Sequence, residues 1–234
     1  MILHTENIGS GSETIVFLHS GLQTGMTDFE NIIPVFKDAY HILLPDLRGH
    51  GKSRCDNLDD YFESAADDLM ETIENLNITK IHLVGVSLGA IIAVHFALRH
   101  KSYVRTLNLS GIMFKEPHNY TELHNTEVNI QANLLENQEV VSYFDNLHGS
   151  GWKQFLEIGK NREWYPFAKN AQIIEENLPI HIILGSRSDH ELETIDEHIE
   201  KKASVTIVKD AGHLVNHDNA IDFSKSVLNY IQDK

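Results

Sequence analysis

A five-residue motif between a predicted strand and a predicted helix restricts the fold of this chain more than any other feature. The motif, Gly-Val-Ser-Leu-Gly at residues 85–89, follows the apolar run at 81–84 and leads into residues 88–98, which are apolar on every side. A residue on such a sharp turn needs small residues two positions before and after it, because larger side chains would collide. The motif therefore predicts a buried strand, a tight turn that exposes Ser87, and a central buried helix.

Apolar, β-branched runs recur along the rest of the chain and alternate with helical patterns. Strands that alternate with helices predict a mostly parallel central sheet with helices on both faces. Between residues 113 and 173 no strand pattern appears, and the spacing predicts two helices, at 127–144 and 152–158. We expect an α/β fold in one domain, residues 1–234, with a core at 1–112 and 174–234 and a short helical lid inserted at 113–173. The predicted strands lie at 14–19, 41–45, 80–86, 104–109, 179–184 and 205–208, and further helices at 61–76 and 220–231.

The composition excludes several classes of protein. Hydrophobic residues make up 41% of the chain and charged residues 23%, which is typical of a globular protein rather than a disordered one. No apolar run is long enough to span a membrane, the first residues do not resemble a signal peptide, and the single cysteine, Cys55, cannot form an internal disulfide. The net charge of −15 disfavours nucleic acid as a partner. We expect a cytoplasmic chain with no membrane partner, and the sequence leaves a homodimer open.

Two further motifs accompany the serine turn. His-Ser-Gly-Leu at 19–22 follows the first predicted strand, and Asp-Leu-Arg-Gly-His-Gly-Lys-Ser at 46–53 follows the second. With these motifs the chain resembles the serine-nucleophile branch of the α/β-hydrolase superfamily, which includes esterases, lactonases, thioesterases and carbon–carbon bond hydrolases. The resemblance implies an α/β-hydrolase fold and an oxyanion hole. The backbone donors of this oxyanion hole would be Leu88 and Gly21. Leu22 is the alternative to Gly21, because Ser20 stands where the family usually has glycine.

A serine hydroxyl becomes a good nucleophile only when a base removes its proton and an acidic group orients that base. The family places the nucleophile, the acid and the base in this order along the chain. Asp189 follows the strand predicted at 179–184, and His213 lies in a Gly-His turn after the next strand. We therefore predict Ser87, Asp189 and His213 as the catalytic residues. The histidines of the insertion lack the spacing of a metal site, so we expect no metal and no cofactor.

The residues next to these motifs predict the substrate. They are apolar, which favours a pocket for a small or medium acyl substrate; the predicted lining is Met26, Met113, Phe114, Leu214 and, from the insertion, Trp152. Aromatic residues of the insertion either roof this pocket or form a small core of their own. The predicted function is hydrolysis of a carboxylic ester, thioester or lactone through an acyl-enzyme. The alternatives are a carbon–carbon bond hydrolase of the same fold, or a small-ligand receptor with slow turnover.

Overall fold

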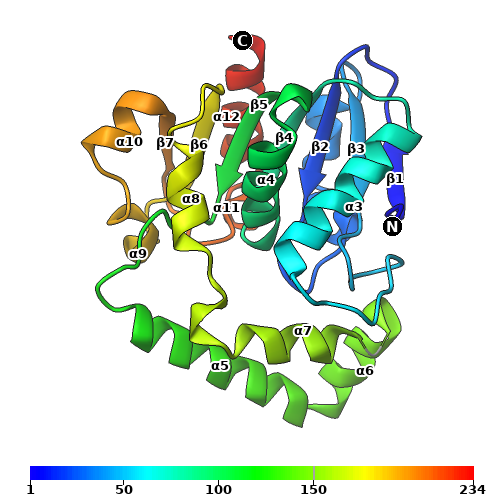
Figure 1. Cartoon of the computed structure of the whole chain (residues 1–234), viewed down its shortest axis with the longest axis vertical. Helices are drawn as coiled ribbons and strands as arrows, with labels where there is room; N and C mark the ends of the chain where they lie inside the picture. Colours follow the sequence, from blue (N-terminus) through cyan, green and yellow to red (C-terminus); the bar gives the residue numbers. More distant parts are fainter. Residues whose placement is uncertain (150) are drawn as a thin grey trace.

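The central element of the structure is a mostly parallel sheet (Figure 1). The computed structural model describes residues 1–149 and 151–234, and within them seven strands form one sheet in the order β1-β3-β2-β4-β5-β6-β7. The strand β1 pairs antiparallel with β3, and the other neighbouring strands are parallel. The predicted α/β sheet is confirmed. The strands are β1 (Thr5–Ile8), β2 (Thr14–Leu18), β3 (His41–Pro45), β4 (Ile81–Val86), β5 (Val104–Ser110), β6 (Ile180–Gly185) and β7 (Ser204–Val208).

The sequence does not predict β1, because this strand lacks a buried apolar run. It has four residues, none of them fully buried, and lies at the edge of the sheet. The central strands β2 and β4 are buried along their whole length and are therefore readable as apolar runs.

Helices cover both faces of the sheet (Figure 1). The helices α3 (Tyr61–Asn75) and α4 (Leu88–Arg99) pack together on one face, and α4 also contacts β2, β4 and β5. This position explains why α4 is apolar on all sides. The other face is covered mainly by α12 (Ala220–Gln232), together with α1 (Gly25–Phe29), α2 (Ile33–Phe36) and α11 (Val215–Asp218). Along the chain, two short helices, α9 (Asp189–Leu192) and α10 (Glu197–Lys202), connect β6 to β7.

Between β5 and β6 the chain forms the helices of the insertion, residues 113–173. They are α5 (Tyr120–Glu136), α6 (Gln138–His148), α7 (Gly151–Gly159) and α8 (Phe167–Ile173), and residue 150 lies outside the described residues. The first three lie across the edge of the sheet at which the parallel strands end, whereas α8 returns to the sheet and packs on α4 (Figure 1). Among the described residues, no helix is long and apolar enough to cross a membrane.

The single helix predicted at 127–144 is wrong, because two helices occupy this stretch. Asn137 lies between them in an extended conformation, and its side chain accepts hydrogen bonds from the backbone N–H groups of Glu139 and Val140. Asparagine is a favoured residue at the start of a helix because its side chain satisfies backbone donors that have no partner within the helix. It therefore ends α5 and begins α6, although the apolar pattern continues through it.

Candidate active site

Ser87 occupies a strained turn between β4 and α4. Its φ and ψ angles are +53° and −114°, a region that side chains rarely adopt. A Cβ atom at position 85 would lie 2.4 Å from the carbonyl oxygen of Gly89, and one at position 89 would lie 2.0 Å from that of Leu18. Only glycine fits at either position. The motif is therefore required by the close packing of β4, α4 and β2 around the serine.

His213 connects Ser87 to a carboxylate. Its Nε2 atom lies 2.8 Å from the Oγ atom of Ser87, and its Nδ1 atom lies 2.5 Å from the Oε1 atom of Glu191. An ionised carboxylate only accepts hydrogen bonds, so these partners assign the proton to Nδ1. The lone pair of Nε2 then faces the serine hydroxyl and can accept its proton. We call Ser87, His213 and Glu191 the triad.

The structure does not bring Asp189, the acid predicted from the sequence, against His213; it places Glu191 against the imidazole instead. Both residues belong to α9, and residues two positions apart on a helix point in widely different directions. Asp189 is the first residue of α9 and is exposed, whereas Glu191 is only 1% exposed. The sequence-based choice missed Glu191 because it treated the segment after β6 as a loop; a helix beginning after Ser188 would have made position 191 the inward-facing candidate.

The charge of Glu191 controls the titration of His213. Desolvation alone would lower the pKa of His213, but the hydrogen bond and negative charge of Glu191 outweigh it, and the carboxylate of Glu127 on α5 adds to their effect. The result is a pKa above the usual value for histidine.

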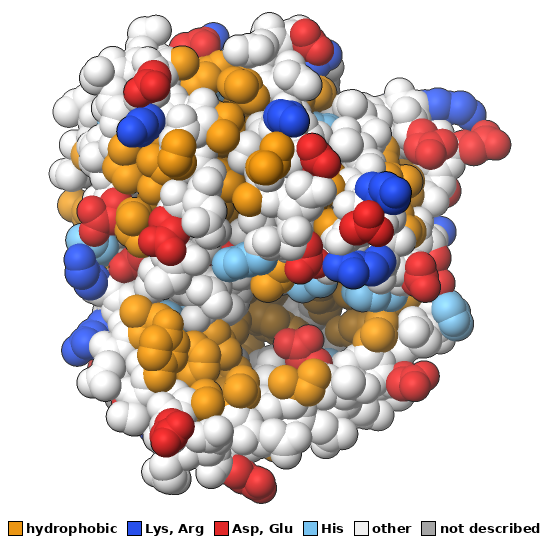
Figure 2. Space-filling model, turned by 180° about the vertical axis from the view of Figure 1, so that it is seen from behind, with side chains coloured by type: hydrophobic (Ala, Val, Ile, Leu, Met, Phe, Trp, Pro, Cys, Tyr) orange, Lys and Arg blue, Asp and Glu red, His pale blue; other side chains and the backbone are white. Residues whose placement is uncertain are grey.

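The side chain of His213 is 45% exposed. Figure 2 shows the molecule hollowed between the sheet core and the insertion, with histidine and hydrophobic side chains at the rim.

The loop predicted to carry oxyanion donors lies between the core and the insertion. The N–H group of Ser20 donates to the buried carboxylate of Asp28 at 2.6 Å, so this donor already has a partner. Leu22 adopts a left-handed φ of +61°. A Cβ atom at position 21 would lie 3.6 Å from the ring of Phe155 on α7, a contact that the sequence did not reveal. The loop is thus held by the core on one side and bordered by α7 on the other.

His148, the last residue of α6, joins this loop to the insertion. The N–H group of Gly51 donates to its Nδ1 atom at 2.8 Å, and its Nε2 atom donates to the carbonyl oxygen of Leu22 at 3.0 Å. Burial lowers the pKa of His148 to about 4, so the ring is neutral near pH 7 and can serve as acceptor and donor together. The imidazole therefore bridges two core loops from the insertion.

We expect His148→Ala to lower the free energy of unfolding by about 2–4 kcal/mol. The change leaves the N–H group of Gly51 and the carbonyl group of Leu22 without their partner, and each unpaired buried group costs roughly 1–3 kcal/mol. It also leaves a cavity beside the stacked ring of Phe144. Urea denaturation measures the effect. His118→Ala is the control, because this histidine also lies in the insertion but its side chain is 80% exposed; equal losses in the two variants would contradict the bridging role.

The residues predicted to line an apolar pocket differ in exposure. Met26, Met113 and Leu214 are half-buried and can contact a ligand. Trp152 is fully buried, donates its Nε1–H group to Asp145 at 2.8 Å and packs on Phe144, and Phe114 is 3% exposed. Trp152 and Phe114 therefore offer almost no exposed surface to a ligand in this structure, unlike the other three predicted residues. Trp152 instead packs in the hydrophobic core that joins the insertion to the sheet and its helices.

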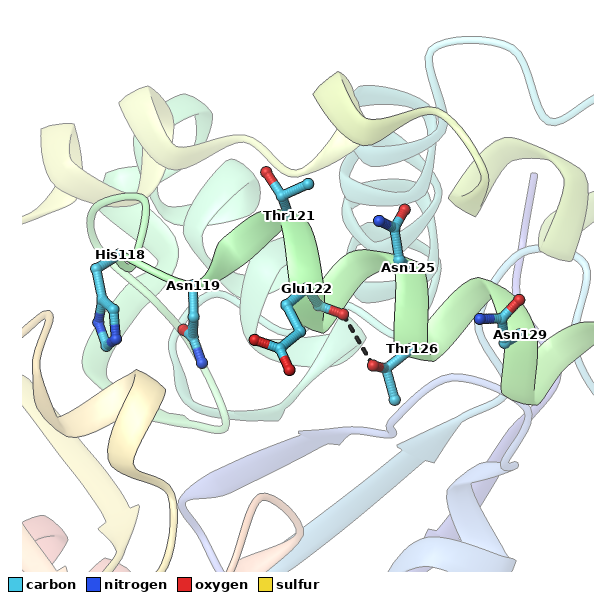
Figure 3. Close-up of a pocket in the computed structure, with 7 residues that line it drawn as sticks. All are labelled: His118, Asn119, Thr121, Glu122, Asn125, Thr126 and Asn129. Atoms are coloured by element: carbon cyan, nitrogen blue, oxygen red, sulfur yellow. Dashed lines mark hydrogen bonds between the residues drawn. The ribbon is translucent and has the colours of Figure 1, made fainter.

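A separate, wide-mouthed cavity lies along α5 (Figure 3). Its volume is about 640 Å³ and its lining is polar, formed by His118, Asn119, Thr121, Glu122, Asn125, Thr126 and Asn129. It includes no residue of the triad and none of the predicted pocket residues. The cavity is therefore a depression on the surface of one helix and not the space in front of Ser87.

Known proteins resemble this chain in sequence and in fold. The family model for the alpha/beta hydrolase fold matches residues 13–151. The chain is 36% identical over 113 residues to a 2-hydroxy-6-oxononadienedioate/2-hydroxy-6-oxononatrienedioate hydrolase of Escherichia coli O81 (strain ED1a), and 32% identical over 113 residues to serine hydrolase BPHL of Mus musculus. Each match covers 47% of this chain and 39% of the relative. The chain thus spans about two fifths of the length of these relatives.

Solved structures share the whole fold at lower sequence identity. NosK from Streptomyces actuosus superposes with a TM-score of 0.81 and 23% identity, covering 94% of this chain and 98% of that one. At this identity the likeness concerns the fold alone. The family model, in contrast, matches more than half of the chain, including the strand β4 and the turn that carries Ser87. By this match, the chain belongs to the α/β-hydrolase fold family.

Proposed function

We propose that this protein is a serine hydrolase that cleaves small or medium carboxylic esters, thioesters or lactones through an acyl-enzyme. The proposal rests on one observation, the hydrogen-bonded series from Ser87 through His213 to Glu191. This series supplies a nucleophile, a base and a group that orients the base, which are the requirements of covalent acyl transfer.

In the proposed first step, the Nε2 atom of His213 takes the proton of Ser87 while the Oγ atom forms a bond to the carbonyl carbon of the substrate. The carbonyl oxygen becomes an oxyanion, which the backbone N–H groups of Leu88 and Gly21 would stabilise. The intermediate then collapses, and the leaving alcohol departs with the proton held by His213. In the second step His213 takes a proton from water while the water oxygen forms a bond to the acyl carbon. The bond between that carbon and the Oγ atom of Ser87 then breaks, the proton on His213 passes to Oγ, and the carboxylic acid leaves.

The charges around His213 favour an uncharged substrate. Glu191 bonds to the imidazole, and Glu127 lies near enough for its charge to raise the pKa of His213. The whole chain carries a net charge of −15. A dianion would be repelled by this arrangement.

A second candidate function, carbon–carbon bond hydrolysis, comes from the name of the bacterial relative, a hydrolase of dienedioates.

Turnover of p-nitrophenyl esters from acetate to decanoate tests the proposal, together with peptide mass mapping of rapidly quenched and digested protein. We expect the highest kcat/KM at short or medium chains, and an acyl adduct on the peptide that contains Ser87. Turnover of a 2-hydroxy-6-oxodienoate without turnover of any ester would favour the carbon–carbon hydrolase. Ligand binding without turnover of either substrate class would favour a receptor role.

A further inference from the structure

His190 lies beside the triad and has no part in the proposed proton transfer. Its Nε2 atom is 3.6 Å from the Oε1 atom of Glu191, which is beyond hydrogen-bonding distance. The side chain of His190 is 29% exposed and that of Glu191 only 1%. The second carboxylate oxygen of Glu191, Oε2, is buried and has no hydrogen-bond partner among the described residues. A buried carboxylate therefore has unused acceptor capacity next to an imidazole that solvent can reach.

The positions of three ligand atoms are suited to a metal ion. One nitrogen of His190, one carboxylate oxygen of Glu191 and one nitrogen of His213 all lie within 4.8 Å of one another. In tetrahedral zinc sites, nitrogen and oxygen ligands lie about 2.0–2.2 Å from the ion, so neighbouring ligand atoms are roughly 3.4 Å apart. The Nε2 atom of His190 already lies 3.6 Å from the Oε1 atom of Glu191, whereas the Nδ1 atom of His213 lies 2.5 Å from it and would have to move away by roughly 1 Å.

We propose that His190, Glu191 and His213 form a Zn²⁺ site, and that zinc bound there switches the hydrolase off. Two imidazoles and one carboxylate are a donor set that zinc prefers, and the fourth position is left for water. The exposed parts of His190 and His213 give the ion access from solvent. The site is not recognisable from sequence spacing, because residues 190 and 191 meet residue 213 only in the folded chain.

The inhibitory effect, which rests on the proposed function, follows from the two nitrogens of one imidazole. In the triad, Nδ1 of His213 carries the proton and Nε2 holds the lone pair that accepts the proton of Ser87. Zinc binds a lone pair on Nδ1, so the proton must leave Nδ1 and, through solvent, return to Nε2. His213 stays neutral, but its Nε2 atom is then a donor. It can no longer act as the base.

Calorimetric titration with zinc chloride tests the site directly, without any catalytic readout. We expect one strong site in the wild-type protein and a loss of about tenfold or more in its affinity in His190→Gln. The matched control is His198→Gln, because His198 also pairs with a glutamate, Glu175, but its side chain is 57% exposed and neither residue belongs to the proposed site. With 15 histidines in the sequence, weak background binding is expected in every variant. Equal affinity in wild type and His190→Gln would overturn the proposal.

Ester turnover then tests the switch. His190→Gln keeps the triad, so we expect its basal kcat/KM to remain within about twofold of wild type and its inhibition by zinc to be lost. Inhibition of the wild type should be reversed by EDTA. Zinc that binds at His190 but leaves turnover unchanged, or increases it, would overturn the inhibitory role. If no variant turns over any ester, the proposed function fails, and the calorimetric difference still decides whether the zinc site exists.

Discussion

Ser87→Ala is expected to lower kcat for p-nitrophenyl butyrate by about 10⁶, the loss found when a triad nucleophile is removed from a serine protease. The substitution removes the only atom that forms the covalent intermediate, and His213 then has no hydroxyl to deprotonate. A residual acceleration of roughly 10³–10⁴ over water is expected from backbone donors and substrate binding. Initial rates, corrected for spontaneous hydrolysis, measure this loss.

The control for this variant is another half-buried serine. Ser64 lies on α3, and its hydroxyl group donates only to the backbone carbonyl of Asp59 at 3.2 Å. We expect Ser64→Ala to retain wild-type turnover. Both variants should keep the wild-type circular dichroism spectrum, since alanine at position 87 keeps the Cβ atom and hence the strained backbone of the turn. Turnover by Ser87→Ala within tenfold of wild type would exclude Ser87 as the nucleophile.

Glu191→Gln is expected to lower kcat by about 10⁴, by analogy with the loss caused by an amide at the acid position of a Ser-His-Asp triad. A glutamine can present its NH₂ group to the Nδ1 atom of His213, which favours the tautomer with the proton on Nε2. That tautomer cannot accept the proton of Ser87. Glutamine has nearly the same volume as glutamate, so the substitution leaves the packing around position 191 intact. Single-turnover and steady-state rates with the same ester measure the effect.

The pH profile separates this role from a merely structural one. His213 must be neutral to act as a base, and its raised pKa places the acidic limb of kcat/KM above pH 6.5 in the wild type. In Glu191→Gln the two largest interactions that raise this pKa are lost, while desolvation, which lowers it, remains. We therefore expect the acidic limb to move to lower pH. A limb that stays in place would contradict direct coupling between Glu191 and His213.

Asp189→Asn is the matched control for Glu191→Gln. Both changes convert a carboxylate to an amide on α9, but Asp189 is exposed and Glu191 is buried. We expect Asp189→Asn to keep kcat within about twofold of wild type and to leave the pH profile unchanged, as is usual for surface substitutions. The opposite ranking of the two variants would restore Asp189 as the acid.

Features that depend on residues close together in the chain could be predicted without the structure. The alternation of apolar runs and helical patterns predicted the parallel sheet and the central helix α4, because buried strands and buried helices leave long apolar stretches. The glycines at 85 and 89 predicted the turn of Ser87, because its steric demands act over five residues. His213 was predicted from its Gly-His turn and its order along the chain, and it lies against Ser87.

Several contacts between side chains of different elements could not be predicted from the sequence. Asp189 and Glu191 are both acidic, and the direction of α9 against the sheet decides that Glu191 reaches His213. The contacts of His148 with Gly51 and Leu22 join residues about a hundred positions apart, and the burial of Trp152 depends on how α6 packs against α7. Local sequence patterns indicate which residues are buried and which lie in turns. The hydrogen-bond partner of a buried polar group, in contrast, depends on how helices and strands pack together.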